Sequence, residues 1–277
     1  MRKMTCCSLA CGLALWTGAG VAAGQAANPG VTKSVVILEA HPGEMAGCIG
    51  MTMLLKQKGY RIHVVDVTYG SDGATPGACA EEERKACAEL GATLHFLGRE
   101  KGGVFADKAL CFELSDLFRE IRPAAVLTHW PIDTDIDRVV TGGSAFKSLS
   151  MAGRYGMEPL TQIYFFETLC GSLNFRPLYY VYTNHVLADA AKVLACYDKA
   201  KLAPDLSALH DYVNEKGRVT ATAKDPTTLR AWECWPHPKH AEAYAAHDNY
   251  VYAHTTKNYY PLPIFAEISS AFGKELK

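Results

Sequence analysis

The chain has 277 residues, which is enough for one large domain with a well-buried core. Hydrophobic residues account for 49% of the chain and charged residues for 21%, values that are typical of globular proteins and that exclude disorder or a fibrous repeat. The formal net charge is -1, so the sequence offers no basic surface for neutralising phosphates and we expect no nucleic-acid partner.

The first residues have the layout of a secretory signal peptide. Arg2 and Lys3 precede an apolar stretch from Leu9 to Trp16, and small residues follow at 21–24. This apolar stretch is shorter than the ~20 residues that a membrane-spanning helix needs, which favours a cleaved signal over a membrane anchor. We therefore expect a signal peptide at 1–26, a single mature domain at 27–277, no stable membrane span after cleavage, and a secreted or periplasmic protein.

Export bears on the cysteines. Seven of the ten cysteines lie beyond the predicted signal peptide, and none of them shows the C-x-x-C spacing of a structural zinc site. Most are interpreted as small buried apolar residues. One or two disulfides remain open in an oxidising compartment, and the sequence does not pair them.

Short apolar runs alternate with longer helical stretches from residue 34 onward. We predict strands at 34–40, 61–68, 93–97 and 125–129, and helices at 45–58, 80–90 and 108–121. Further along we predict strands at 162–167 and 178–183, helices at 188–201 and 240–247, and a polar connection at 221–237. The alternation predicts an α/β fold in a single domain, with a Rossmann-like, mostly parallel sheet and helices on both faces.

Polar residues follow the first and the fourth predicted strands. Ligands of parallel sheets bind at the carboxyl ends of the strands, which places His41–Glu44 and His129–Arg138 in one neighbourhood. The first of these segments is EAHPGEMAGCIGMT at 39–52, and it resembles the AHPDDAELGCGGT segment of the PIG-L/LmbE-type sugar N-deacetylases. The resemblance continues through GYRIHVVDVTYG at 59–70 and THWPID at 128–133, and smaller segments follow in the family's order over nearly the whole mature chain.

The resemblance implies a zinc-dependent hydrolase that removes N-acetyl groups from N-acetylhexosamine-containing glycoconjugates. In the family, the first motif supplies a histidine and an aspartate to zinc, and another aspartate acts as the general base on the zinc-bound water. By this resemblance, His41 keeps the first ligand and Glu44 stands at the carboxylate ligand. Gly43 stands at the position of the base and offers no proton acceptor.

The second motif departs further from the family. Arg138 replaces the histidine that supplies the third zinc ligand, and a guanidinium has no lone pair for a metal. Asp137 matches the family, whereas Asp135 replaces a histidine thought to stabilise the tetrahedral intermediate. Tyr197 replaces another family histidine, and Cys79 replaces the arginine of an R-x-x-E segment that ends at Glu82. We therefore expect zinc to be absent or weakly bound.

Three interpretations of this site remain open. In a catalytically silent relative, Arg138 pairs with Glu44 where the metal charge would lie. In an active hydrolase with a rearranged site, His41, Glu44 and a carboxylate of the second motif bind a divalent ion, and the catalytic candidates are Asp135 and Asp137. In a glycan-binding protein, the cleft that holds the substrate in the family binds a sugar without catalysis. The candidate substrate-binding residues are Tyr69, Glu82, Trp130 and Asp133, with Trp232 and Trp235 as further aromatic candidates.

Overall fold

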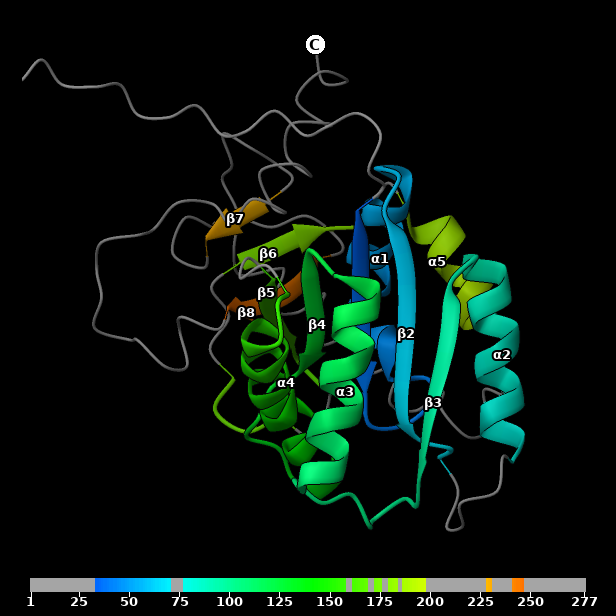
Figure 1. Ribbon diagram of the computed structural model, residues 1–277. Helices are drawn as coiled ribbons and strands as arrows, with labels where there is room; N and C mark the ends of the chain where they lie inside the picture. The colour runs from blue at the N-terminus through cyan, green and yellow to red at the C-terminus, as the bar shows by residue number, and fades with distance from the viewer. Residues whose placement is uncertain are drawn as a thin grey trace, which may run out of the picture. The chain divides into compact units, whose positions relative to one another are not determined.

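One mixed sheet of eight strands forms the centre of the described chain (Figure 1). The computed structural model describes residues 33–70, 77–157, 161–168, 172–175, 179–183, 186–197, 228–230 and 241–246, all within the compact unit Thr32–Lys277. The strands are β1 (Ser34–Glu39), β2 (Arg61–Thr68), β3 (Thr93–Arg99), β4 (Ala125–His129), β5 (Gln162–Phe166), β6 (Tyr179–Tyr182), β7 (Thr228–Arg230) and β8 (Ala241–Ala246). The helices are the 3-10 helix η1 (Glu44–Cys48) and the α-helices α1 (Ile49–Gln57), α2 (Ala78–Leu90), α3 (Lys108–Ile121), α4 (Ile136–Arg154) and α5 (Leu187–Leu194).

The strand order is β3-β2-β1-β4-β5-β8-β6-β7. The pairs from β3 to β5 are parallel, and β8, β6 and β7 extend the sheet by antiparallel pairing. Because β1 pairs with β2 on one side and with β4 on the other, the direction of strand order reverses between β1 and β4. Ligands of such sheets bind at this reversal, beyond the carboxyl ends of the strands.

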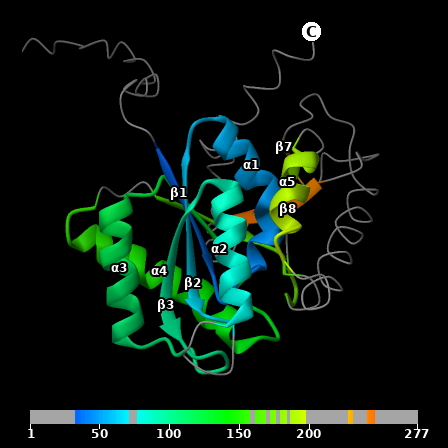
Figure 2. The same ribbon diagram turned by 90° about the vertical axis from the view of Figure 1, so that its right-hand side faces the viewer.

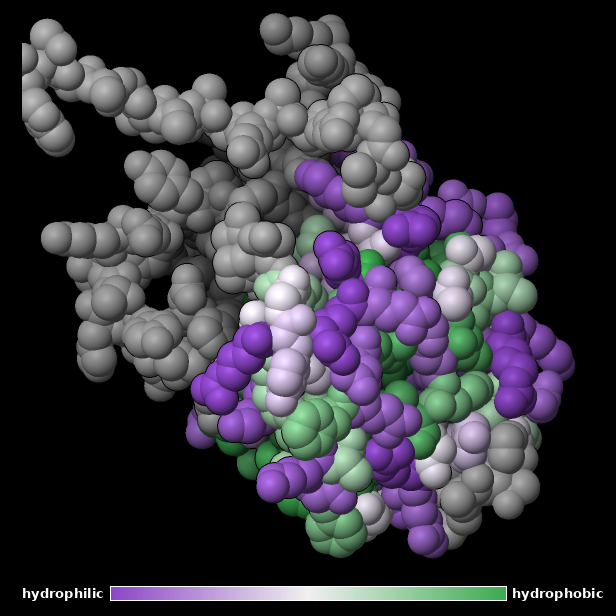
Figure 3. All heavy atoms as spheres, in the orientation of Figure 1, coloured by the Kyte–Doolittle hydropathy of each residue, from purple (hydrophilic) through white to green (hydrophobic). Residues whose placement is uncertain are grey.

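Helices cover both faces of the sheet (Figure 2). Alternate side chains of β1 point to opposite faces, so Val35 and Ile37 pack in the core with α1, α2 and α5, whereas Val36 and Leu38 pack in the core with α3 and α4. This arrangement confirms the predicted single α/β domain with a mostly parallel sheet and helices on both faces. On the face of the described residues drawn in Figure 3, hydrophilic and hydrophobic side chains are interspersed.

The predicted elements of the first half agree closely with the structure. The strands β2 and β4 and the helix α3 have the predicted bounds, and β1, β3 and α2 differ by one or two residues at an end. The predicted helix at 45–58 is divided into η1 and α1, and only its second part is α-helical.

Two predictions for the later chain were wrong, and one helix was missed. The segment predicted as a helix at 240–247 contains strand β8, because its residues pair with β5 and β6 and bury Tyr244 and Ala245. The predicted connection at 221–237 contains strand β7. The long helix α4 was not predicted.

Several predictions fall outside the described residues. They include the signal peptide at 1–26 and the aromatic candidates Trp232 and Trp235. The helix predicted at 188–201 corresponds to α5, which ends earlier, at Leu194. Among the described residues, no helix is both long enough and apolar enough to cross a membrane. The described cysteines are free thiols: Cys48, Cys79, Cys87, Cys111 and Cys196.

Candidate active site

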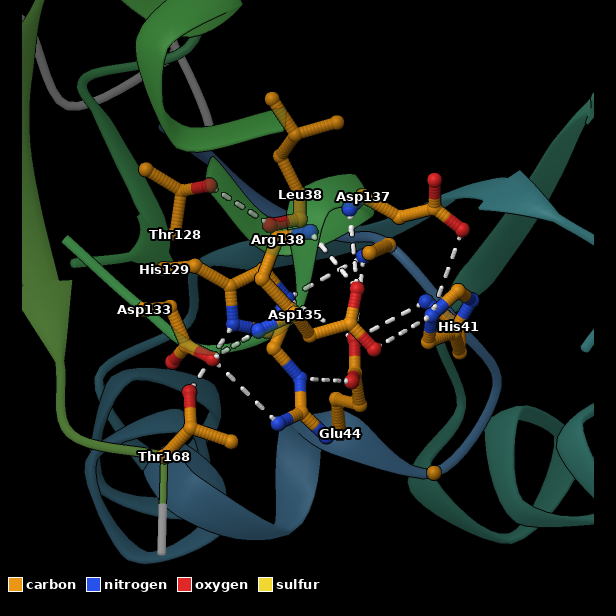
Figure 4. Close-up of polar contacts among 12 residues, drawn as sticks. Leu38, His41, Glu44, Thr128, His129, Asp133, Asp135, Asp137, Arg138 and Thr168 are labelled. Carbon is orange, nitrogen blue, oxygen red and sulfur yellow. Dashed lines mark hydrogen bonds and ion pairs between the residues drawn. The ribbon is translucent and has the colours of Figure 1, made fainter. Parts of the chain in front are cut away.

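His41 lies directly beyond the carboxyl end of β1 and is buried (Figure 4). Its Nδ1 lies 2.9 Å from the Thr68 hydroxyl, and that hydroxyl donates its own proton to the Ala40 carbonyl oxygen at 2.9 Å. The Thr68 oxygen therefore accepts from Nδ1–H, which leaves the lone pair of a neutral His41 on Nε2. Nε2 faces the second motif.

Two carboxylates converge on this Nε2 atom. It lies 3.4 Å from Asp135 Oδ2 and 3.6 Å from Asp137 Oδ2. Asp135 caps the amino end of α4, where its Oδ1 accepts from the backbone N–H of Asp137 at 2.8 Å. Asp137 is buried and accepts from the N–H groups of Gly102 at 2.5 Å and Val104 at 3.1 Å. An imidazole lone pair facing two carboxylates requires a proton or a cation between them.

Glu44 is the centre of a second set of polar contacts. Its Oε2 accepts from the backbone N–H of His41 at 2.9 Å and lies 2.9 Å from His129 Nε2. Its Oε1 accepts from Arg138 Nε at 2.5 Å. Burial alone would raise the pKa of the Glu44 carboxyl, but His129, Arg138 and His41 together outweigh burial and lower this pKa below its ordinary value. Glu44 is therefore a buried carboxylate held by cationic and polar neighbours.

Arg138 occupies the place that the resemblance gives to the third zinc ligand. Besides Glu44, its guanidinium lies 3.7 Å from Asp133 Oδ1. Burial lowers the pKa of Arg138, but Glu44, Asp133 and Asp135 raise it further, so the net shift is upward and the side chain stays a cation. The ion pair of Arg138 with Glu44, which the interpretation as a catalytically silent relative includes, is present.

The structure does not fit the family's zinc ligand set. Glu44 is already engaged by Arg138 and His129, and the third position holds a guanidinium that gives no lone pair. Gly43, at the position of the base, has a φ of 93°, a left-handed conformation that favours glycine in this turn. The residues that could instead hold a metal are His41, Asp135 and Asp137, whose nearest ligand atoms all lie within 4.8 Å of one another.

His129 is a site residue to which the sequence gave no role. Its side chain is fully buried at the end of β4, next to Glu44 and 3.3 Å from the Thr168 hydroxyl through Nδ1. The signal that could have found it is the THWPID segment, in which a histidine directly follows a buried apolar strand.

The proposed substrate-binding residues do not line one open surface. Trp130 is buried, donates its indole N–H to the Leu173 carbonyl oxygen, and contacts Phe165 and Phe175 edge to face. Burial and the edge-to-face contacts indicate that Trp130 packs in the core. Its ring is not exposed for stacking on a sugar, as the glycan-binding interpretation required. The Asp133 side chain is also buried, and it accepts from the Asp135 N–H and from the Ser172 hydroxyl.

The two remaining candidates lie directly after β2 and on α2. Tyr69 is half-buried, with its ring 4.9 Å from that of Phe96, and Glu82 is half-buried on α2. Arg84, an arginine close in sequence to Glu82, is exposed and pairs with Glu81 instead of replacing the missing arginine. Tyr197 donates its hydroxyl to Glu83 of α2 at 2.8 Å.

These features define a class of protein: a doubly wound α/β domain with a polar site at the strand-order reversal. Residues 36–146 match the model of the PIG-L family, described as GlcNAc-PI de-N-acetylase. The resemblance inferred from the segments at 39–52 and 128–133 is thereby confirmed.

Individual relatives include hydratases as well as deacetylases. The chain is 31% identical over 112 residues to a 4-oxalmesaconate hydratase of Pseudomonas putida, a match covering 35% of this chain and 43% of the hydratase. The match thus spans less than half of that curated relative. Two solved structures show the same fold. The 4-carboxy-2-hydroxymuconate hydratase of Pseudomonas putida has a TM-score of 0.63 and 20% identity, and the match covers 83% of this chain and 100% of the hydratase. The N,N'-diacetylchitobiose deacetylase of Pyrococcus horikoshii has a TM-score of 0.60 and 18% identity, and the match covers 82% of this chain and 88% of the deacetylase.

Proposed function

We propose that this protein is a PIG-L-type relative that does not catalyse zinc-dependent N-deacetylation. The contact of Arg138 Nε with Glu44 Oε1 at 2.5 Å carries the proposal. It places a permanent cation next to the carboxylate that the resemblance assigns to zinc, and a metal ion at the same place would be repelled by it. With Gly43 at the position of the base, no side chain there accepts a proton from water.

The test is a metal and activity assay on the purified protein. We expect less than one tightly held zinc per chain and no acetate release from N-acetylglucosamine or N-acetylated oligosaccharides. The variant Arg138→His restores an imidazole, and we expect it to retain more zinc than the wild type. Stoichiometric zinc in the wild-type protein, or acetate release that disappears in His41→Ala, would refute the proposal.

A second candidate function rests on a different observation. His41 Nε2 and the Oδ2 atoms of Asp135 and Asp137 converge, and one nitrogen with two carboxylate oxygens is a plausible ligand set for a divalent metal. A metal bound there would supply an activated water, and Asp135 or Asp137 would hold the proton that this water loses. Because similar proteins include hydratases and a deacetylase, the reaction class would be addition or hydrolysis by water.

Metal titration separates the two candidates. If His41, Asp135 and Asp137 hold a metal, Zn²⁺ or Mn²⁺ binds to the wild-type protein and to Arg138→Met but not to His41→Ala. If the protein is a relative without a catalytic metal, neither metal binds at His41. A panel of N-acetylated sugars and unsaturated dicarboxylic acids then tests turnover with the metal present.

We also propose two properties that the sequence suggests independently of catalysis. Export through the segment 1–26 predicts that the mature chain is recovered outside the cytoplasm and begins near residue 27, which cell fractionation and N-terminal sequencing check. The remaining alternative function is binding of an N-acetylhexosamine ligand in the cleft that holds the substrate in the family, and glycan-array binding tests it. Binding that persists in Tyr69→Ala and in Glu82→Gln would remove the residues assigned to that role.

A further inference from the structure

A second group of acidic side chains is buried where β1, β2 and α2 meet. Glu39 is the last residue of β1, Asp66 is its register partner on β2, and Glu83 comes from α2. All three side chains are completely buried. One oxygen atom of each lies within 4.8 Å of the others. Three elements thus direct carboxyl groups to one point inside the core.

Two of these carboxyl groups lack ordinary partners. Among the described residues, no group other than these two carboxyls themselves forms a hydrogen bond with Glu39 or Asp66. Glu83 differs, because its Oε2 accepts from the Gly43 N–H at 2.7 Å and from the Tyr197 hydroxyl at 2.8 Å. No lysine, arginine or histidine of the described chain forms an ion pair with any of the three.

Such a group requires a compensating positive charge. Burial raises the pKa of Glu39 well above its ordinary range, and repulsion from the neighbouring carboxylates raises it further. Burial raises the pKa of Asp66 well above its ordinary range and repulsion from Glu83 raises it further, although a hydrogen bond with Glu39 opposes the rise. Burial likewise raises the pKa of Glu83 to about 7. A buried carboxylate without donors must take up a proton or bind a cation, because the protein interior solvates its charge poorly. The thiols of Cys48 and Cys87 on this face cannot supply that charge.

We propose that Glu39, Asp66 and Glu83 form a buried site for a divalent cation, separate from His41. The ligands are all carboxylate oxygens, which suit hard ions such as Mg²⁺, Ca²⁺ and Mn²⁺ better than zinc. Oxygen atoms on opposite sides of one such ion, each about 2.0–2.4 Å from it, are separated by at most about 4.8 Å. One oxygen atom of each of the three side chains lies within this span of the others, so a single ion could contact all three.

The charges also balance. A divalent ion with one proton retained by the group would neutralise three carboxylates. The ligands of the site are the oxygens of Glu39 and Asp66, to which no other described group donates. Glu83 is oriented by Gly43 and Tyr197. This proposal is independent of the proposed loss of deacetylase activity, since it uses neither His41 nor Arg138.

The alternative is that Glu39 and Asp66 share protons and bind no ion. The test measures Mn²⁺ binding by electron paramagnetic resonance, and the melting temperature with and without EDTA, on the whole mature chain. We use the His41→Ala background, which removes the other candidate metal site. We expect one Mn²⁺ per chain, with a melting temperature that EDTA lowers and that Mn²⁺, Ca²⁺ or Mg²⁺ restores.

Glu83→Gln is the first matched variant, because a glutamine oxygen can still accept from Gly43 and Tyr197. We expect it to bind Mn²⁺ at least roughly tenfold more weakly than its background. Asp66→Asn is the second, and Glu81→Gln on the exposed side of α2 is the control that keeps binding unchanged. Absence of Mn²⁺ binding at millimolar concentration, or binding that Glu83→Gln and Asp66→Asn both leave intact, overturns the proposal. The Mn²⁺ measurement on the His41→Ala background decides it even if both acidic variants fail to fold.

Discussion

Single residues determine whether the strand-end site can hold a metal. Glu44 touches His41, His129 and Arg138 within one buried space, so a change at any of them alters its charge balance. The arrangement is therefore coupled, because replacing Glu44 or Arg138 leaves the other as an uncompensated charge.

Arg138→Met is expected to destabilise the protein by about 3 kcal/mol at pH 7, because breaking a buried ion pair leaves one charge unpaired. In that variant Glu44 would keep the contact of its Oε2 with His129 Nε2 at 2.9 Å and would lose its guanidinium partner. Urea unfolding followed by circular dichroism measures the change. The double variant Glu44→Gln/Arg138→Met is the control, and its loss should be smaller than the sum of the single losses. Equal unfolding midpoints for Arg138→Met and wild type would show that the ion pair adds no stability.

Trp130→Ala tests whether the tryptophan packs or binds sugar. Because Trp130 is buried between Phe165 and Phe175, we expect a loss of roughly 3–5 kcal/mol of stability. Tyr69→Ala, at a half-buried ring, is the matched comparison and should cost less. A stable Trp130→Ala protein that had lost glycan binding would reinstate the sugar-binding interpretation.

At the scale of elements, helix α4 carries half of the site because it begins directly after the loop that follows β4. Asp135 caps it, Asp137 lies in its first turn, and Arg138 follows. The helix approaches the strand closely at Gly142, where an added Cβ atom would lie 2.4 Å from the His129 carbonyl oxygen. Gly143, the next residue, has no atom within 4 Å of such a Cβ.

These neighbouring glycines form a matched pair. Gly142→Ala should destabilise the protein by about 1–3 kcal/mol and displace α4 from β4, since the backbone must shift to avoid the clash. Gly143→Ala should be neutral or stabilising by roughly 0.5–1 kcal/mol, because alanine favours the helix. Thermal unfolding of both variants checks the pair. Equal effects would mean that the contact of α4 with β4 does not depend on Gly142.

The same close approach explains why the sequence did not reveal α4. Two adjacent glycines and several serines lower its helix propensity, and contact with β4 requires one of those glycines. Strand β8 is the opposite case, a strand whose sequence favours a helix. Its alanines and glutamate have high helix propensity, but pairing with β5 and β6 determines the structure. The elements of the parallel half were predictable because their apolar pattern and their burial agree.

The site was predictable only in part for a similar reason. The sequence placed His41, Glu44 and the second motif together, since strand ends of a parallel sheet meet at one edge. It did not reveal that Glu39 and Asp66 are buried register partners, because an acidic residue in a strand usually indicates a solvent-exposed position. Burial of charge depends on packing by α2, which a local pattern does not report.

At the scale of the whole molecule, one carboxylate joins distant parts of the chain. Glu242 of β8 accepts from the N–H groups of Gly50 at 2.5 Å and Met51 at 2.8 Å, at the amino end of α1 and more than 190 residues earlier. The Tyr244 hydroxyl donates to the same carboxyl at 2.6 Å. The antiparallel half of the sheet is thereby attached to the first helix of the parallel half.

This contact predicts a dependence of stability on pH. Burial raises the pKa of Glu242 to about 7, although hydrogen bonds from Tyr244, Met51 and Gly50 oppose the shift. Between its ordinary value of 4.5 and about 7, the folded protein therefore binds a proton that the unfolded chain has released. The stability contributed by this group is present below pH 4.5, falls as pH rises toward 7, and then levels off.

Glu242→Gln removes the titrating group and keeps an acceptor for the helix. We expect the stability of wild type relative to this variant to fall by roughly 3 kcal/mol between about pH 5 and pH 8, measured by urea unfolding at both values. The exposed Glu113→Gln serves as the control, for which the difference should stay constant. A wild-type advantage that is equal at both pH values would mean that Glu242 is ionised throughout, and that the amino end of α1 stabilises its charge more strongly than burial opposes it.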